Sequence, residues 1–474
     1  MSKYYLGSTP PPVGFTKFAN RFMYSWNPLF NKIMDLKDEA YEAWKRTSSI
    51  EDFYAILEYN STVDRWMYLS KDPFWSSIRP FLRIKQDGDV VLFRYEKLIA
   101  MYSKAEEYGF TSSEDVWHAW DNLLQYARSI TINIRDETIV TCPFDKFFNI
   151  GEVEESSWEY VTELMSHAKS CGKNIEYSEK LDGSIFICRY LREKNEFFTH
   201  TSGSLTCDDN DILVGARKMF FADTPEGNAV RIMVKQHPEQ TFMFEYISQD
   251  NPIVVQYDES QDGLYLIGIR ENCTGDYFTY AAQRSLAKRY PGVKYTRTFA
   301  NKKWEDILEI VKNASGDTME GFVINIDGHL FKLKTDDYVK LHRFIGNVAG
   351  PNRIIKAVAD GEFDDIMSKI PPNLRKRFIN IAQIAIKYDS DRRKKVNDYY
   401  NQIPLEFLNN RKDTMLWIEA NVPSSYRGDV REKYLGRERA TYLKQPKGKD
   451  DCRYVSISEI APDFKDVAIV PDDE

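Results

Sequence analysis

The sequence is poor in the residues that bind transition metals or build disulfide frameworks. Its 474 residues include six Cys with no C-x-x-C pair, and six His with no H-x-H or H-x-x-x-H cluster. This spacing excludes the usual zinc motifs and disfavours a histidine-based metal site. The N-terminus, MSKYYLGSTPPPVGF, also lacks the apolar region of a secretory signal. We therefore expect reduced thiols and a cytoplasmic location, in the host cytoplasm if the source is a virus.

Long apolar runs are also absent. No stretch reaches the ~18 consecutive apolar residues that predict a membrane-spanning helix, so we expect no membrane partner. With only 23 Gly and 19 Pro the chain is not collagen-like, and 42% hydrophobic with 29% charged residues is typical of a globular protein rather than a disordered one. At roughly 150 residues per domain, the length predicts about three domains.

The net charge of −8 conceals an asymmetry along the chain. Residues 371–450 contain 18 Lys and Arg against 10 Asp and Glu, a balance of 18 − 10 = +8, so the rest of the chain sums to −16. A basic segment in an otherwise acidic protein can bind nucleic acid, although a solvated helix face is the alternative. The candidate phosphate contacts are Arg375, Lys376, Arg377, Arg392, Arg393, Lys394 and Lys395.

The apolar periodicity predicts an α+β protein in three parts. Residues 1–81 predict a helical N-terminal extension, residues 82–345 a strand-rich central domain, and residues 346–474 a helical C-terminal domain that is a candidate for RNA binding. The central part opens with a hairpin around Asp87-Gly88, a helical stretch at 96–126 and a hairpin around Arg135-Asp136. Further strands are expected at 174–191, 196–206, 240–248, 263–271, 277–282 and 320–334, with helices at 155–169, 210–222, 280–289 and 303–313.

One predicted strand carries the residues of a covalent nucleophile site, Glu179-Lys180-Leu181-Asp182-Gly183-Ser184. Lysine is a poor core-strand residue, and glycine allows another backbone to approach closely. A lysine amine becomes a nucleophile when burial or a nearby positive charge, such as a metal ion or a second lysine, lowers its pKa. Taken alone, K-x-D-G also fits a strand that ends in a D-G turn with a solvated lysine.

Charged residues on the downstream strands favour the catalytic interpretation. Glu245 stands between two aromatic residues in a predicted strand, and Glu320-Gly321 begins another. Lys332 and Lys334 alternate with apolar residues and therefore share one strand face. Two lysines side by side on a sheet are destabilising unless an anion binds there, and nucleotide phosphates would supply it. Carboxylates that hold a metal ion would neutralise phosphoryl charge.

In this order, K-x-D-G, the strand glutamate, E-G-F-V and K-L-K resemble the motifs of the covalent nucleotidyltransferases, the ligases and capping enzymes. Four further segments narrow the resemblance to the phage RNA ligase 1 family of ATP-dependent RNA ligases. The resemblance covers residues 82–345. The four segments are Lys146-Phe147-Phe148-Asn149, Asp250-Asn251-Pro252-Ile253-Val254-Val255, Arg270-Glu271-Asn272 with Thr274-Gly275, and FKLKTDDYVKLH at 331–342.

The resemblance implies a nucleotidyltransferase domain of two antiparallel sheets with flanking helices and an ATP cleft between the sheets. It implies ATP and Mg²⁺ or Mn²⁺ as cofactors. It also implies an enzyme that repairs RNA or tRNA, with single-stranded ends or a broken tRNA loop as its partner, and we expect a monomer. Residues 1–81 have no counterpart in this resemblance.

The resemblance also implies roles for individual residues. Lys180 would take AMP, Lys332 and Lys334 would hold the α-phosphate, and Arg128 and Lys146 would orient the pyrophosphate leaving group. Asp182, Glu245 and Glu320 are the implied catalytic carboxylates, with Glu245 on either the metal or the ribose. These three, with Asp364 and Asp365, are the implied metal ligands, and Phe148, Gly183, Tyr246, Gly321 and Tyr338 complete the implied nucleotide site.

Some of these assignments have a plain structural alternative. Core packing explains Phe148 and Tyr338 equally well, and helix capping explains Asp364-Asp365 at least as well as a metal site. The chain also departs from the family at two positions. Ser202 stands before Gly203 where relatives commonly have a basic residue, so one phosphate contact is either missing or replaced. The A-R-G of the family ends in Ser129 here.

Two other functions are weighed against an RNA ligase. DNA ligases and capping enzymes append an OB-fold after the K-x-K strand, whereas residues 345–474 predict helices. A non-catalytic RNA-binding protein on the same fold would have lost the nucleophile or the carboxylates, and none of them is lost. Incubation with labelled ATP and Mg²⁺ in the absence of RNA would distinguish the three functions.

Overall fold

The computed structural model describes residues 25–47, 73–105, 107–208, 210–437, 439–446 and 452–464. The chain divides into two compact units, residues 1–339 with 471–474, and residues 340–470. This division lies close to the predicted boundary at 345/346, whereas the described residues before 82 belong to the first unit. Within the described residues, no helix is both long enough and apolar enough to cross a membrane.

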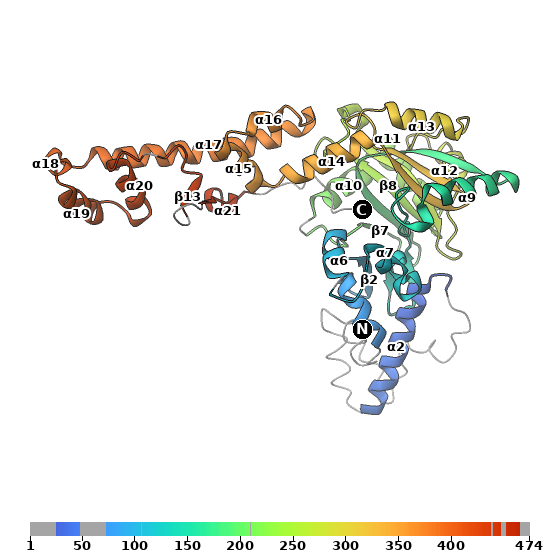
Figure 1. Cartoon of the computed structure of the whole chain (residues 1–474). Coiled ribbons are helices and arrows are strands. Elements are labelled where there is room, and N and C mark those ends of the chain that lie inside the picture. Colours follow the sequence, from blue (N-terminus) through green and yellow to red (C-terminus); the bar gives the residue numbers. More distant parts are fainter. Residues whose placement is uncertain are drawn as a thin grey trace. The chain divides into compact units, whose positions relative to one another are not determined.

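The first sheet along the chain has four antiparallel strands in the order β1-β2-β3-β4, of which Figure 1 labels β2. The predicted hairpins around Asp87-Gly88 and Arg135-Asp136 are its two outer connections, so both predictions are confirmed. The helices between β2 and β3 lie in the predicted helical stretch, and one of them is capped by the Ser112 side chain. The bounds are β1 Leu82–Asp87, β2 Val90–Tyr95, β3 Arg128–Asn133, β4 Thr138–Thr141, α6 Leu98–Ala105, α7 Ser113–His118 and α8 Leu123–Tyr126.

The helix α2 (Pro28–Thr47) packs its apolar residues into the same core as the four-stranded sheet, together with α5 (Pro73–Ile78). Lys37 on α2 is buried and donates to the Ile134 carbonyl oxygen and to Glu137, at 2.8 and 2.9 Å. This part of the predicted N-terminal extension is therefore an integral layer of the first unit. The part of the predicted helical extension at 48–72 lies outside the described residues.

A five-stranded sheet follows, in the order β10-β9-β8-β6-β7. It is antiparallel except for the short edge pair β10–β9, and helices α10, α11 and α12 pack on it. The prediction of a strand at 277–282 is wrong, because only Tyr277 forms a β-bridge, with Arg270, and the helix α12 begins at Tyr280. The helix α11 was not predicted from the sequence. The bounds are β6 Ser184–Leu191, β7 Glu196–Thr201, β8 Gln240–Ile247, β9 Gly263–Glu271, β10 Lys294–Tyr295, α10 Asp211–Phe221, α11 Pro225–Gln236 and α12 Tyr280–Ala287.

A three-stranded antiparallel sheet in the order β12-β11-β5 packs against helices α9 and α13. The chain passes from this sheet to the five-stranded one through the short connection between Lys180 and Ser184, so the predicted nucleophile segment joins two sheets. The α+β class is confirmed, and the four-stranded sheet is present in addition to the two predicted sheets. The bounds are β5 Ile175–Lys180, β11 Gly321–Ile326, β12 His329–Lys334, α9 Trp158–Ser170 and α13 Trp304–Asn313.

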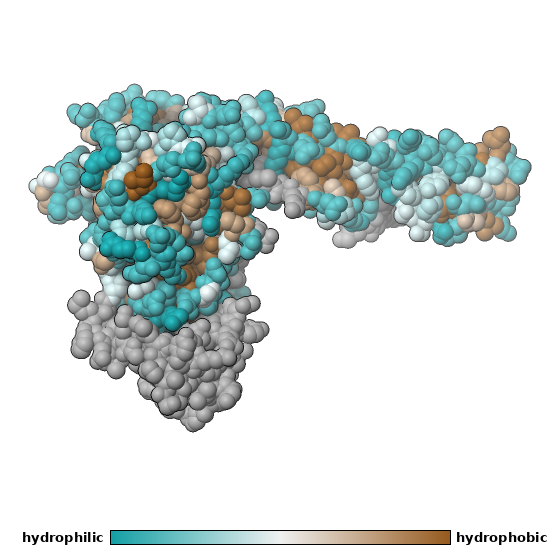
Figure 2. All heavy atoms as spheres, turned by 180° about the vertical axis from the view of Figure 1, so that it is seen from behind, coloured by the Kyte–Doolittle hydropathy of each residue, from teal (hydrophilic) through white to brown (hydrophobic). Residues whose placement is uncertain are grey.

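The second unit is mainly helical, as predicted, but also contains a two-stranded sheet that the sequence did not indicate. Apolar side chains are visible on its surface (Figure 2), and its exposed residues include Leu405 and Leu416. The helix α14 (Asp336–Val348) crosses the division between the units. The bounds are α15 Pro351–Asp360, α16 Phe363–Met367, α17 Pro372–Asn401, α18 Leu405–Leu408, α19 Arg411–Asn421, α20 Ser424–Tyr434, α21 Ile457–Ile460, β13 Lys444–Pro446 and β14 Cys452–Tyr454.

Candidate active site

The three-stranded sheet brings two of the predicted lysines into one row. Lys180 ends β5, Lys334 ends β12, and both lie opposite Gly321 at the start of β11. Gly321 has φ +152°, and a Cβ on this residue would lie 2.0 Å from the Leu333 carbonyl oxygen. Only glycine allows the strands to approach this closely. The row therefore fixes the two lysines on either side of one backbone position.

Glu320, directly before β11, joins these two lysines. Its Oε2 accepts a hydrogen bond from Lys180 Nζ at 2.8 Å, and its Oε1 lies 2.9 Å from Lys334 Nζ. The Glu320 side chain is 2% exposed, against 10% for Lys180 and 24% for Lys334. Two cations that share one buried carboxylate carry a net positive charge, which is suited to a phosphate group.

Asp182 lies in the connection from β5 to β6 and holds three elements together. Its Oδ2 accepts the backbone N–H groups of Val254 and Val255, and its Oδ1 accepts the Tyr338 hydroxyl, each at 2.8 Å. Burial and, after it, the negative charge of Glu320 raise the pKa of Asp182 to about 6. The Asp182 and Glu320 carboxylates are therefore close enough to interact electrostatically.

Gly183 and Glu245 meet next to this connection. The Gly183 N–H donates to Glu245 Oε1 at 3.0 Å, and a Cβ on Gly183 would lie 2.5 Å from the Tyr246 carbonyl oxygen. Tyr246 itself is buried, and its hydroxyl lies only 2.3 Å from where a Cβ on Gly215 of α10 would be. Glu245 thus contacts the nucleophile segment. The Tyr246 ring packs in the core beneath α10. The nucleotide role of Tyr246 stays a prediction.

A second basic group surrounds Phe147. The Arg128 guanidinium carbon and Lys332 Nζ each lie 4.8 Å from the centre of the Phe147 ring, which is a cation–π distance. The Lys332 N–H donates to the Phe148 carbonyl at 2.9 Å, and the Ile150 N–H donates to the Lys332 carbonyl at 2.8 Å. These bonds hold the K-F-F-N segment beside β12 and bring two predicted site residues, Arg128 and Lys332, onto one ring.

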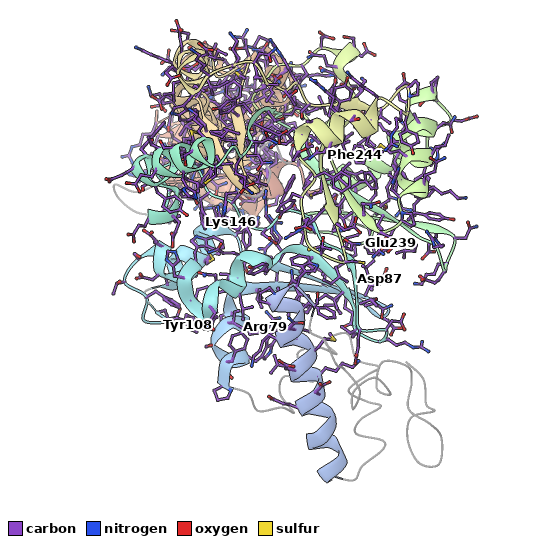
Figure 3. All side chains as sticks on the ribbon, turned by 90° about the vertical axis from the view of Figure 1, so that its right-hand side faces the viewer. Arg79, Asp87, Tyr108, Lys146, Glu239 and Phe244 are labelled. Carbon is purple, nitrogen blue, oxygen red and sulfur yellow. The ribbon has the colours of Figure 1, made fainter. Side chains whose placement is uncertain are left out.

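Lys146 and Phe148 are packed more deeply. Lys146, labelled in Figure 3, pairs with Glu152 at 3.1 Å and lies over the rings of Trp117 and Phe148. Although burial acts to raise it, the charge of Lys146 and the hydrogen bond from Asn149 hold the pKa of Glu152 below its usual range. Phe148 belongs to the core of the four-stranded sheet. These contacts are those of a structural support, and the nucleotide roles of both residues stay predictions.

Arg270 of the R-E-N segment anchors the same region from β9. Its two terminal nitrogens pair with the two Asp145 oxygens at 2.8 and 2.7 Å. Its guanidinium lies 4.3 Å from the ring centres of both Trp26 and Tyr277. Such a bidentate, ring-stacked arginine fixes geometry strongly. Trp26, before α2, therefore helps to hold the segment that carries Lys146.

The second unit carries the remaining predicted residues. Asp364 and Asp365 are exposed in the first turn of α16, where they complement the helix dipole, and their metal role stays a prediction. Arg392 pairs with the buried Asp429 at 2.6 Å, and Arg393 donates to the Ala440 carbonyl at 2.8 Å. Of the seven candidate phosphate contacts, the exposed ones are Arg375, Lys376, Lys394 and Lys395.

Three buried carboxylates, Asp182, Glu245 and Glu320, could hold a divalent metal ion. They are 5%, 4% and 2% exposed, respectively. Burial is the main reason why the pKa of the Tyr257 hydroxyl is raised, and the negative charges of all three carboxylates raise it further. Oxygen ligands of this kind suit Mg²⁺ or Mn²⁺. Their oxygens do not converge as a closed cage, so they fit an ion that keeps water or phosphate oxygens in its coordination shell.

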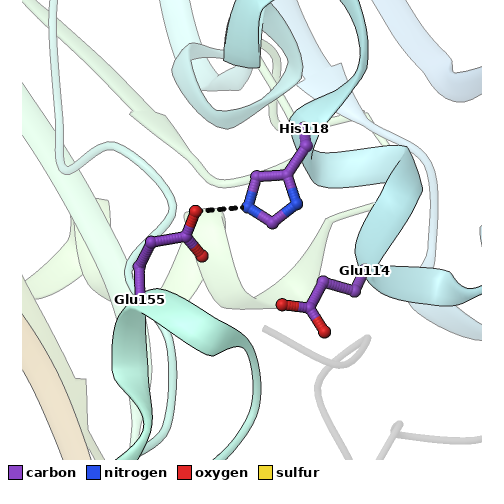
Figure 4. A group of neighbouring side chains, drawn as sticks. All are labelled: Glu114, His118 and Glu155. Carbon is purple, nitrogen blue, oxygen red and sulfur yellow. Dashed lines mark ion pairs between the residues drawn. The ribbon is translucent and has the colours of Figure 1, made fainter. Parts of the chain in front are cut away.

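Among the described residues, a single group of three His, Cys, Asp or Glu has all its ligand atoms within 4.8 Å, namely Glu114, His118 and Glu155 (Figure 4). His118 Nε2 lies 2.7 Å from Glu155 Oε1, and Glu114 accepts the Glu154 N–H at 2.6 Å. These contacts connect α7 to the turn at 154–156 on the surface. They explain the group as a structural link.

Sequence reasoning missed two residues of the site. The Tyr257 hydroxyl accepts the Asp182 N–H at 2.8 Å, yet nothing in the sequence distinguishes it from the other 28 of the 29 tyrosines. Phe147, rather than the adjacent Phe148, carries the two cations. Its place in the K-F-F-N segment was a usable signal, but the sequence does not tell which of the two neighbouring rings faces Arg128 and Lys332.

Comparisons with known proteins find RNA ligases. The family described as RNA ligase matches residues 126–339. A protein named as a bifunctional polynucleotide kinase/RNA ligase, from Autographa californica nuclear polyhedrosis virus, is 27% identical over 52% of this chain. A protein named as an RNA ligase, from Thermovibrio ammonificans, is 24% identical over 67% of it, and RNA ligase 1 of bacteriophage TS2126 is 23% identical over 51%.

The matches span different shares of these relatives, namely 34% of the baculovirus protein, 74% of the bacterial one and 58% of the phage one. The matched region of this chain contains Lys180, Glu245, Glu320, Lys334 and all the other predicted site residues of the first unit. The resemblance to the phage RNA ligase 1 family is therefore confirmed over residues 126–339.

Proposed function

We propose that this chain, whose residues 126–339 match the RNA ligase family, is an ATP-dependent RNA ligase. It joins an RNA 3′-hydroxyl to a 5′-phosphate through a lysyl-AMP and an RNA-adenylate, in the repair of RNA or tRNA in the cytoplasm. The observation that carries this proposal is the row of Lys180 and Lys334 around Glu320, in which a nucleophile and a phosphate-binding cation share one buried carboxylate.

In the first step Lys180 attacks the α-phosphorus of ATP. A bond forms between Nζ and phosphorus, the bond to the bridging oxygen of the β-phosphate breaks, and pyrophosphate leaves. Lys180 Nζ must lose a proton to react, and Glu320 Oε2, 2.8 Å away, is placed to accept it. Lys332 and Lys334 supply positive charge where charge develops on the α-phosphate.

A divalent ion, Mg²⁺ or Mn²⁺, would be held by Asp182, Glu245 and Glu320, and it would neutralise charge on the phosphate oxygens. The hydrogen bonds from Val254 and Val255 fix the Asp182 carboxylate whether or not an ion is bound. Removal of metal ions by a chelator is therefore expected to stop adenylation without unfolding the first unit.

The two later steps use the same residues. AMP passes from Lys180 to the 5′-phosphate of RNA, which forms a pyrophosphate bond and frees the lysine. The RNA 3′-hydroxyl then attacks the activated 5′-phosphate and displaces AMP. The positive charge of the Lys180–Glu320–Lys334 row suits each phosphate in turn. The exposed lysines of the second unit are the candidates for holding the RNA strand.

The alternative functions have less support. A DNA ligase or capping enzyme would carry an OB-fold after β12, whereas the described residues of the second unit form helices and one two-stranded sheet. A non-catalytic RNA-binding protein has no need for a lysine nucleophile, a buried glutamate and a second lysine aligned around Gly321.

The test is self-adenylation with ATP labelled at its α-phosphate, in the presence of Mg²⁺ and without RNA. We expect a labelled protein that forms poorly with GTP, and no label on Lys180→Ala. Lys180→Arg is expected to be equally inactive, because a guanidinium does not deprotonate at working pH. The labelled protein should seal single-stranded RNA with a 5′-phosphate. Label on Lys180→Ala, or sealing of nicked DNA alone, would contradict the proposal.

A further inference from the structure

A cavity of about 250 Å³ in the first unit is lined by four cations and by no Asp or Glu. Arg83 and Lys85 come from β1, Arg94 from β2 and Arg128 from β3. The lining continues to Gly183 and Ser184, the last two residues of the nucleophile segment. Positive groups gathered in one concavity raise the local concentration of anions. The cavity is therefore suited to a multiply charged anion.

Arg94 is the most enclosed of these cations, at 8% exposure. The pairing of β2 with β3 shifts between Phe93 and Arg94, so that Arg94 lies opposite Arg128. A terminal nitrogen of Arg94 lies 2.8 Å from where a Cβ on Gly203 would be. The absence of a side chain at residue 203 thus leaves room for the Arg94 guanidinium against the loop after β7.

The same loop is held from the other side by Ser129. The Ser129 hydroxyl donates to the Ser202 carbonyl at 2.5 Å, although Ser129 has φ +70°, a conformation that favours glycine. This hydrogen bond fixes the loop that carries Gly203 next to the Arg94 guanidinium.

We propose that Arg94, together with Arg128, holds the β- and γ-phosphates of ATP in this cavity. The inference rests on the proposed function and names a further phosphate-binding residue of the same reaction. When Lys180 forms its bond to the α-phosphorus, the departing pyrophosphate takes the electron pair of the broken P–O bond. Arg94 and Arg128 balance the charge of that leaving group.

Arg94→Gln separates this role from a structural one. Its KM for ATP in self-adenylation is expected to rise at least tenfold, and so is the pyrophosphate concentration needed to reverse that step. Sealing of chemically pre-adenylated RNA, which needs no ATP, should stay within twofold of the wild-type rate. Arg94→Lys should recover most of the ATP affinity, and Arg192→Gln, an exposed arginine in the turn after β6, is the matched control.

Three outcomes would overturn the proposal: unchanged KM for ATP, loss of sealing alone, which would place an RNA phosphate in the cavity, or equal loss of both steps with a lower melting temperature. Calorimetry with inorganic tripolyphosphate needs no catalysis. It should show binding to the wild type that is weakened at least tenfold in Arg94→Gln. If the wild type binds tripolyphosphate but is never adenylated, the proposed function fails and the phosphate cavity stands. If it does not bind, the cavity assignment fails.

Discussion

At the residue scale, lysines of the site are paired with buried or half-buried glutamates. Glu320 alone is shared by Lys180 and Lys334, and Glu152 serves Lys146. A buried ion pair contributes little net stability when intact, because desolvation offsets the attraction, but its loss leaves an uncompensated charge. Substitutions of these carboxylates are therefore expected to affect folding as well as chemistry.

Glu320→Ala tests this directly. Without the carboxylate, Lys180 and Lys334 lose the partner that they share across Gly321, so we expect a loss of stability on the order of 3 kcal/mol. Adenylation should fall by at least ~10²-fold, because the proton acceptor and a metal ligand are lost together. Thermal melting and α-labelled ATP measure the two effects. Normal adenylation in a destabilised protein would show that Glu320 is only structural.

The burial of His200 predicts that the free energy of unfolding decreases at acidic pH. It is fully buried on β7, its Nδ1 donates to the Thr201 carbonyl at 2.9 Å, and its Nε2 therefore accepts from the Thr141 hydroxyl at 2.7 Å. Burial lowers the pKa of His200 to about 4. Because the folded-state pKa is depressed below 6.5, the stability it contributes is present above pH 6.5 and is lost as the pH falls towards 4.

The expected loss over that interval is on the order of 3 kcal/mol. Chemical denaturation at pH 7, 6, 5 and 4 measures it. His200→Gln, which keeps a donor and an acceptor but does not titrate, should flatten the dependence. An equally steep pH dependence in this variant would assign the effect to other groups.

At the scale of elements, the β11–β12 hairpin offers a matched pair of glycines. A Cβ added to Gly321 would lie 2.0 Å from the Leu333 carbonyl oxygen. A Cβ added to Gly328, which has φ +94° in the turn, would have no atom of another residue within 4 Å among those described. Both substitutions to Ala carry a backbone cost of about 1 kcal/mol. Only Gly321→Ala also forces β12 away from β11 and displaces Lys334.

We therefore expect Gly328→Ala to adenylate at nearly the wild-type rate and Gly321→Ala to lose at least ~10²-fold, since a misplaced phosphate contact costs about that much. Rates of labelling at saturating ATP compare the two, with melting temperatures alongside. Similar activity in both variants would mean that the close approach at residue 321 is not needed to position Lys334.

At the scale of the whole molecule, the basic segment of the second unit separates into two kinds of residue. Arg392 and Arg393 are bonded to Asp429, Asp389 and nearby carbonyl groups, and so stabilise the unit itself. Lys394 and Lys395, by contrast, are exposed on α17, as is Lys376. Sequence charge alone could not separate them, because all of these residues lie on one helix.

We expect the combined variant Lys376→Gln, Lys394→Gln and Lys395→Gln to weaken RNA binding. Each lost phosphate contact reduces the log–log salt slope by about 0.7, or about 2 in total if all three bind. Self-adenylation should be unchanged, because these residues lie outside the first unit. Arg392→Gln should instead lower the melting temperature. An unchanged salt slope in the triple lysine variant would exclude these lysines as RNA contacts.

The sequence alone predicted the candidate site residues and most of the strands that carry them. The alternation in residues 174–191 and 320–334 predicted β5, β6, β11 and β12, and the K-L-K spacing predicted two lysines on one face of a strand. Apolar periodicity and turn residues depend only on neighbours along the chain, so these features can be predicted from the sequence. It failed at 277–282, where α12 took over part of a predicted strand, because short amphipathic stretches fit either period.

Only the tertiary structure decided which groups meet. Lys180 and Glu320 are 140 residues apart, and Asp182 and Tyr338 are 156 apart. Their contacts follow from the strand order β12-β11-β5 and from the docking of α14, which no local pattern encodes. The same holds for Arg94 beside Gly203 and for Tyr257 beside Asp182. Side-chain partners across strands depend on register and packing, and these are fixed only when the whole core forms.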